Sequence, residues 1–153
     1  MPNWCYNRVR IDADSDQVEQ LKEIHDIFDN HSDPFNQILP IPDFKNIPND
    51  KGELPKLEQR FNPDGSLFYE TYNFPDGKND DRWYHWCIDN WGTKWEPDIA
   101  SVDGDQDSEM LEIVFNTAWS PPEGVVEKMR EKYPKLTFQC FYDEPGCEIA
   151  GYY

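Results

Sequence analysis

A proline-rich stretch, residues 34–81, restricts what this chain can fold into more than any other feature. Seven of the thirteen prolines fall within it, together with the turn-forming triplets Pro63-Asp64-Gly65 and Pro75-Asp76-Gly77. Proline fixes φ and removes a backbone donor, so we expect no long helix or strand to run through this stretch. The regular elements must therefore lie before and after it. The short apolar runs at 35–41 and 67–74 are expected to fasten it to the rest of the protein.

The residues before this stretch predict one strand and one helix. Side chains alternate over 4–11, so that Cys, Asn, Val and Ile occupy one face while Trp, Tyr and two Arg occupy the other. Apolar residues then recur at helical spacing from Val18 to Phe28, after an acidic turn that supplies N-caps. Pro34 ends this region, because the residue before proline is pushed out of the α conformation.

The residues after the stretch predict the other elements of the fold. They are a short Trp-rich helix at 82–91, a hairpin of strands 99–102 and 110–119, a helix at 121–133, a strand at 136–142 and an edge strand at 147–153. The clearest local signal is Ser120-Pro121-Pro122-Glu123, a capping box with proline at the first helical position.

Apart from the insertion, the predicted order is βαββαβ. This is the split βαβ arrangement of a ferredoxin-like domain, an α+β fold in which two helices cover one face of an antiparallel sheet. We predict one domain over residues 1–153. It contains an insertion at 34–95 that follows the first helix and carries both the proline-rich stretch and the short Trp-rich helix. The C-terminal residues add an edge strand to the sheet.

Several separated motifs resemble one known family. They are Met1-Pro2-Asn3-Trp4-Cys5 with Asn7, Leu39-Pro40-Ile41-Pro42, Asn90-Trp91-Gly92-Thr93-Lys94-Trp95 and Thr117-Ala118-Trp119-Ser120-Pro121-Pro122. Together, and in this order, they resemble the YubB-like family of plasmid and phage proteins across the whole chain. The resemblance implies a ferredoxin-like fold with an inserted helical segment, and a gene carried on mobile elements. It implies no catalytic residues, because the family is uncharacterised.

Charge and composition limit the functions to consider. The chain has 31 acidic and 14 basic residues, a formal charge of -17, and this disfavours nucleic acid as a direct partner because phosphate binding relies on Lys and Arg. The N-terminus shows no secretory signal and no apolar run is long enough to span a bilayer, so we expect a cytoplasmic protein without a membrane partner. The four cysteines are then expected to be reduced thiols. The oligomeric state stays open.

No residue pattern indicates catalysis or metal binding. Asp103, Asp105 and Asp107 start like a calcium loop, but Ser108 and Val114 stand where that loop needs glycine and glutamate. The widely spaced cysteines lack the close pairs of zinc sites, and the three histidines belong to no recognisable motif. We therefore predict a protein that is not an enzyme, with no catalytic residues, no metal and no cofactor.

The Trp-rich segment 83–95 has two interpretations. As core, its tryptophans would fasten the insertion to the open side of the sheet. As a surface, Trp91, Lys94 and Trp95 would stack single-stranded bases, with Arg8, Arg10 and Arg82 as nearby cations. We favour the core, because fourteen basic residues make a poor backbone groove, and we keep single-stranded nucleic-acid binding as the alternative function.

The densest run of charge contains seven acidic residues and no base from Glu96 to Glu112. From this run we predict a partner-binding acidic surface formed by Asp98, Asp103, Asp105, Asp107, Glu109 and Glu112. A folded array of carboxylates can imitate a phosphate backbone and engage a basic, nucleic-acid-binding protein of the host or the mobile element. Such a protein would serve as a nucleic-acid mimic or an anti-defence factor. The plain alternative is that the charge only provides solubility.

Overall fold

A computed structural model describes residues 2–104 and 107–153, which form two compact units. Unit 1 contains residues 1–40 and 87–153, and unit 2 contains residues 41–86. The inserted unit is therefore shorter than the 34–95 that we expected. The reason is that Phe35 and Trp91 are both buried in the core of unit 1, where their rings meet edge to face with centroids 5.6 Å apart.

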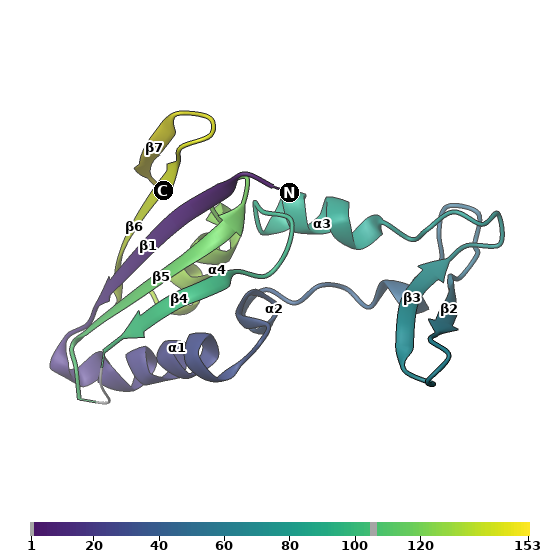
Figure 1. Cartoon of the computed structure of the whole chain (residues 1–153). Helices are drawn as coiled ribbons and strands as arrows, with labels where there is room; N and C mark the ends of the chain where they lie inside the picture. The colour runs from purple at the N-terminus through teal and green to yellow at the C-terminus, as the bar shows by residue number, and fades with distance from the viewer. Residues whose placement is uncertain (1, 105–106) are drawn as a thin grey trace. The chain divides into compact units, whose positions relative to one another are not determined.

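Unit 1 is built on a five-stranded antiparallel sheet with the order β4-β5-β1-β6-β7 (Figure 1). The strands are β1 Trp4–Asp12, β4 Asp98–Asp103, β5 Met110–Ala118, β6 Thr137–Glu144 and β7 Ile149–Tyr152. With a helix over residues 18–30 in the connection from β1 to β4 and another over residues 123–132 between β5 and β6, this arrangement confirms the predicted ferredoxin-like βαββαβ fold. It also confirms the C-terminal edge strand, because β7 pairs only with β6 within this sheet.

Helices cover one face of this sheet. The helices of the chain are α1 Val18–Asn30, α2 Pro34–Ile38, α3 Arg82–Asn90 and α4 Glu123–Lys132. The apolar sides of α1 and α4 supply Ile24 and Val126 to the core, where the alternation of β1 places Val9. The α2 helix adds Phe35, which packs edge to face on Phe115 of β5. In the part of the chain that the structure describes, no helix has the length and apolar character needed to cross a membrane.

The start of α4 differs from the predicted capping box. The helix begins at Glu123, its N-cap is Pro122, and no side chain caps it. The Ser120 hydroxyl instead donates to the carbonyl oxygen of Gly92. This occurs because Trp119 adopts a positive φ of 71° and turns the chain before the helix, so that Ser120 faces the end of α3 rather than the first turn of α4.

Unit 2 contains a β-hairpin that the sequence analysis did not predict. Strands β2 Lys56–Phe61 and β3 Leu67–Asn73 pair antiparallel, with the predicted turn at Pro63-Asp64-Gly65 between them. The run at 67–74, expected to fasten the insertion to the body, is mostly this exposed strand.

A single arginine organises the rest of unit 2. The Arg82 guanidinium donates to Asp80 at 2.8 Å and to the carbonyl oxygen of Phe44 at 2.7 Å. Its central carbon also lies 5.0 Å from the ring centroid of Phe44 and 5.2 Å from that of Phe74. This hydrogen bonding holds the pKa of the Asp80 carboxyl below its usual value.

Candidate functional site

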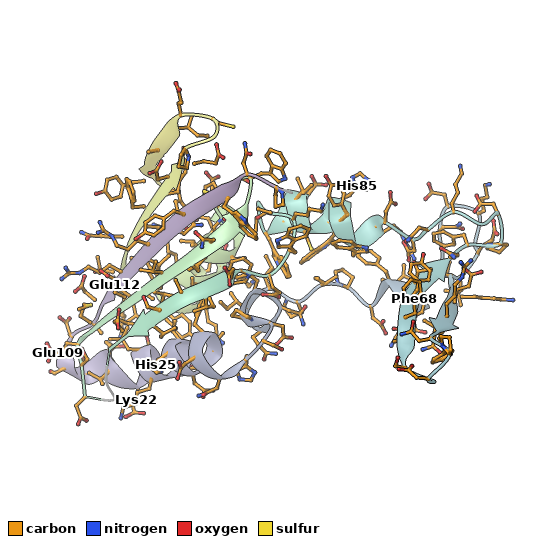
Figure 2. All side chains as sticks on the ribbon, in the orientation of Figure 1. Lys22, His25, Phe68, His85, Glu109 and Glu112 are labelled. Atoms are coloured by element: carbon orange, nitrogen blue, oxygen red, sulfur yellow. The ribbon has the colours of Figure 1, made fainter. Side chains whose placement is uncertain are left out.

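The predicted acidic surface follows β4, the edge strand of the sheet, and its connection to β5. Asp98 and Asp103 stand at the two ends of β4, and both are exposed. Asp103 lies directly opposite Glu112 of β5, and Glu109 is exposed just before β5 begins. Figure 2 places Glu109 and Glu112 at the same end of the sheet. Asp107 is exposed in the connection, and Asp105 lies outside the described residues.

Several carboxylates of this surface have no ion pair, although Glu112 lies opposite Arg10 of β1. Asp98, Asp103, Glu109 and Glu112 form no ion pair with any residue that the structure describes. Unit 1 carries 22 acidic and 8 basic residues, a net charge of -14, whereas unit 2 carries 9 and 6, a net charge of -3. Most of the acidity therefore lies in unit 1. Opposed carboxylates such as Asp103 and Glu112 make the local electrostatic potential more negative.

The face of the sheet opposite α1 and α4 carries aromatic and basic side chains side by side. Arg8 on β1 lies over the ring of Phe141 on β6, with 5.9 Å from its guanidinium carbon to the ring centroid. Tyr152 of β7 meets the same Phe141 ring edge to face at 5.5 Å and is 74 % exposed. These side chains border a small hollow of about 150 Å³ lined by Arg8, Arg10, Glu112, Gln139, Phe141 and Tyr152.

Sequence reasoning named Arg8 and Arg10 but missed the aromatic residues that join them on this face. The signal was present in the alternation of each strand, because Phe141 and Arg8 occupy opposed positions of β6 and β1 and point to the same side. The face is not uniformly basic. Arg10 pairs with Asp12 at 3.1 Å, and this hydrogen bond raises the pKa of its guanidinium. Asp143 and Glu112 share the same side of the sheet by register.

The Trp-rich segment does not gather as a stacking surface. Trp91 is 1 % exposed, and its indole Nε1 donates to the carbonyl oxygen of Leu39 at 2.8 Å. Trp91 is therefore core, as favoured, but it packs with Phe35 on the helix-covered side of the sheet rather than on the open side, and Trp83 is exposed; stacking of a base on Trp91 is contradicted because its ring is enclosed. Trp95 is half-buried, with the Lys94 ammonium 4.5 Å from its ring centroid. Arg82, the third cation considered, is held within unit 2 by Asp80.

Glu96, the residue directly after the Trp-rich segment 83–95, caps the α2 helix. Its two carboxylate oxygens accept hydrogen bonds from the backbone N–H of Phe35 at 2.8 Å and of Asn36 at 2.9 Å. Burial raises the pKa of Glu96 to about 7, and the two backbone donors oppose that shift without cancelling it. The carboxyl is therefore a structural group that titrates near neutral pH.

Cysteines and histidines do not form a catalytic group among the residues described. Burial raises the pKa of the Cys5, Cys87 and Cys140 thiols to about 11, which suppresses the reactive thiolate. Over the same residues, no three His, Cys, Asp or Glu side chains gather in a way that could hold a metal ion. The Nε2 atom of His85, an exposed residue of α3 (Figure 2), lies 3.7 Å from a carboxylate oxygen of Asp81, which precedes the helix.

A hollow of about 460 Å³ lies between α1 and the connection from β4 to β5. Lys22 and His25 of α1 line it and are labelled in Figure 2. The Lys22 ammonium pairs with Glu19 at 3.0 Å, and Asp26 of the same wall accepts from Asn30. Three of the lining side chains, Lys22, Asp26 and Asn30, are thus engaged along α1 itself.

Comparison with known proteins finds similarity over part of the chain. Residues 90–153 match the family model described as a ferredoxin-like domain in Api92-like protein. The uncharacterized protein YubB of Escherichia coli (strain K12) is 29% identical over 73 residues, which cover 45% of this chain and 48% of that relative. The match thus spans about half the length of the curated relative. No solved structure gave a significant match.

Proposed function

We propose that the chain is a non-enzymatic binding protein that engages a basic protein through its acidic surface, and that it is a member of the uncharacterised YubB-like family, which part of it resembles. The partner is a nucleic-acid-binding protein of the host or of the plasmid or phage that carries the gene. The carboxylates of β4 and β5 take the place of phosphates in the complex, as a nucleic-acid mimic or anti-defence factor does.

The observation that supports this proposal is the set of exposed carboxylates without ion pairs along β4 and the start of β5. A charge that is already paired inside the protein gains little from a partner, whereas an unpaired exposed charge can steer and orient one. Asp98, Asp103 and Glu109 meet this condition among the described residues. The net charge of -14 on unit 1 adds a long-range field of the same sign.

A variant of the acidic surface tests the proposal. The four changes are Asp98→Asn, Asp103→Asn, Glu109→Gln and Glu112→Gln. Tagged protein is used to capture basic proteins from a bacterial lysate at 50, 150 and 300 mM NaCl, and a decameric arginine peptide serves as a defined probe in calorimetry. We expect the wild-type protein to recover nucleic-acid-binding proteins in a salt-sensitive way. The variant should bind the peptide at least tenfold more weakly at 50 mM NaCl.

A second variant with the same total charge is the matched control. It carries four changes at exposed acidic positions of unit 1 outside the surface, namely Asp16→Asn, Glu19→Gln, Glu131→Gln and Glu148→Gln. Binding by this control should stay within about threefold of wild type if position matters and not only net charge. Equal weakening of both variants, or capture that does not respond to salt, would contradict the proposal.

The aromatic and basic side chains on the open face of the sheet favour a second candidate, single-stranded nucleic-acid binding. Stacking of Arg8, Phe141 and Tyr152 provides flat surfaces of the kind that bases use. It ranks second because Asp143 and Glu112 share this face and oppose phosphates. Titration with an oligonucleotide tests it, with the emission of exposed Trp4 as the reporter and Trp4→Phe to assign the change. An unchanged emission removes this candidate.

A further inference from the structure

The β2–β3 hairpin of unit 2 exposes an unusual amount of apolar surface. Leu57 is 45 % exposed, Phe61 60 % and Phe68, labelled in Figure 2, 72 %. A two-stranded hairpin is marginally stable in water by itself, and clustered exposed apolar side chains mark an interaction surface. Strand alternation places Leu57 and Phe61 on the same side of β2, and the register puts exposed Leu67 of β3 opposite Phe61, so this side has an apolar face to cover.

Among the described residues, the outer edge of β2 has no backbone partner along its length, whereas the end of the β3 edge is covered. On the outer edge of β3, the carbonyl oxygen of Tyr72 accepts from the backbone N–H of Asp80 at 2.8 Å, and Asn73 bridges to Asn79. On β2, no backbone hydrogen bond joins 56–61 to any described residue other than those of β3. The register shift of the hairpin leaves Phe68 as the extra residue on β3, so β2 remains regular along its length.

We propose that β2 pairs antiparallel with β2 of a second copy of this chain, centred on Gln59, to give a four-stranded sheet β3-β2-β2-β3. A two-fold axis makes such a pairing self-complementary, so one residue faces itself and the others exchange places. With Gln59 at the axis, Leu57 lies opposite Phe61 of the second copy on the apolar face. On the other face, Glu58 lies opposite Arg60 of the second copy.

The charges on β2 select this register over its neighbours. Centring on Glu58 would place Lys56 opposite Arg60, and centring on Arg60 would place that residue opposite itself; both juxtapose like charges. Charged side chains ordinarily protect an edge strand from pairing, but here their signs alternate so that an antiparallel copy is attracted. Lys56, Glu58 and Arg60 form no ion pair with any other described residue, so the charges of Glu58, which accepts from Asn73, and of Arg60, which lies over the Tyr69 ring, are not neutralised within the hairpin.

The distribution of charge between the units also favours this contact. Unit 2 has a net charge of -3, against -14 for unit 1, so two copies repel each other least where unit 2 meets unit 2. Repulsion between more distant charges is screened over about 8 Å at physiological ionic strength. The assembly is therefore expected to strengthen with salt up to the point at which its own Glu58–Arg60 pairs are screened.

A charge exchange tests the register. Multi-angle light scattering at 10 to 500 μM should show the mass rising from 18.1 kDa toward twice that value with concentration. Glu58→Arg alone and Arg60→Glu alone should each leave a monomer at 500 μM, whereas the double variant restores opposite charges and should recover the dimer. Glu19→Arg, an exposed charge reversal on α1, is the control and should dimerise like wild type. A monomer at every concentration, or dimers that ignore all these changes, overturns the proposal.

A cross-linking measurement covers the case in which the charge variants perturb the hairpin, since Glu58 also accepts from Asn73 within it. In a Cys147→Ser background, which removes the exposed native thiol, Gln59→Cys should form a disulfide between copies under mild oxidation. Glu70→Cys on β3 lies one strand away from the axis and should not. Efficient cross-linking at position 70, or none at position 59 in a dimeric sample, overturns the register.

Discussion

Gly124 has no side chain because the end of α3 occupies the space that a side chain would need. A Cβ at this position would stand 1.6 Å from the carbonyl oxygen of Asn90, and the Gly124 N–H donates to the carbonyl oxygen of Trp91 at 3.1 Å. Gly124 thus lets the first turn of α4 lie directly on the Asn90-Trp91-Gly92 motif. Two of the four motifs that suggested the family also meet next to this contact, where the Ser120 hydroxyl donates to the carbonyl oxygen of Gly92.

Gly124→Ala is expected to lower the free energy of unfolding of unit 1 by about 3 kcal/mol, because the α4 backbone must move away from α3. An ordinary glycine-to-alanine change in a helix stabilises by up to about 1 kcal/mol, so the sign alone is informative. Urea denaturation measures the difference. Gly151→Ala is the control, since its Cβ would meet only the Tyr142 ring at 3.6 Å, an ordinary contact. A stabilised Gly124→Ala protein would show that α4 and α3 are not packed this closely.

Glu96 makes stability depend on pH near neutrality. Burial raises its pKa from 4.5 to about 7 in the folded protein, so the folded state binds a proton that the unfolded state has released. This contribution to stability is fully present below pH 4.5 and is lost as the pH rises through 7. After discounting for partial exposure to solvent, the free energy of unfolding is expected to fall by about 1 to 2 kcal/mol between pH 5 and pH 8.

The Glu96 prediction is checked by chemical denaturation at intervals from pH 5 to pH 8. Glu96→Gln removes the titrating group and should flatten the profile, whereas Glu109→Gln, an exposed carboxylate without an ion pair in the described structure, should leave it unchanged. The thiols that titrate in the unfolded chain near pH 9 lie outside this window. A profile that rises with pH, or that is equally steep in Glu96→Gln, would contradict the assignment.

At the scale of elements, strands and helices with strong periodicity could be predicted from sequence, and elements set by distant contacts could not. The alternation in β1 and the apolar spacing of α1 are local, and both match the structure. The local sequence predicted that Ser120 would cap α4, but its hydroxyl donates a hydrogen bond to the carbonyl oxygen of Gly92 instead. The β2 and β3 strands were missed because all of β2 and the first four residues of β3 are exposed, so neither strand shows a regular alternation of burial.

The candidate site was predictable in its acidic part and not in its aromatic part. Asp98 and Asp103 were recognised because a base-free run of charge is visible in one stretch of sequence. The Arg8, Phe141 and Tyr152 cluster draws on three strands, and only the pairing of β1 with β6 and of β6 with β7 brings them together. Contacts between residues of different strands cannot be predicted from their spacing in the sequence until the strand order and register are known.

The β1 strand is the element on which the sheet depends, because it pairs with both β5 and β6 (Figure 1). Residues 90–153, which match the family model, therefore lack the central strand of their own sheet. We expect a fragment of residues 90–153 to be unfolded alone and to fold when a fragment of residues 1–40 is added, because Val9 and Ile11 complete the core.

Near-ultraviolet circular dichroism of the two fragments, separately and mixed, measures this dependence. The control is a chain in which residues 41–86 are replaced by a short Gly-Ser linker, which keeps every strand of unit 1 and should remain folded. A native spectrum from residues 90–153 alone would mean that β5 and β6 find another arrangement without β1.

For the whole molecule, the division into two units with unequal charge has thermodynamic consequences. Unit 1 carries -14 and unit 2 carries -3, and like charges held in a compact state destabilise it. The units also draw on different sources of stability. Unit 1 has a core built on a five-stranded sheet, whereas unit 2 relies on the Arg82–Asp80 pair and the two rings beside it. The units are therefore expected to unfold in separate transitions.

Salt should act on these transitions unequally. Raising NaCl from 20 to 300 mM screens the repulsion within unit 1 and is expected to stabilise it by roughly 1 kcal/mol, a rise of about 4 °C in its Tm. Unit 2 should gain less than half as much, because its net charge is small and salt also weakens its Arg82–Asp80 pair. Differential scanning calorimetry measures both, and Arg82→Lys identifies the transition of unit 2, since lysine keeps the charge but loses the paired hydrogen bonds. Equal shifts of the two transitions would mean that repulsion among the carboxylates of unit 1 contributes little to its stability, and that the acidic surface is maintained at no energetic cost to the fold.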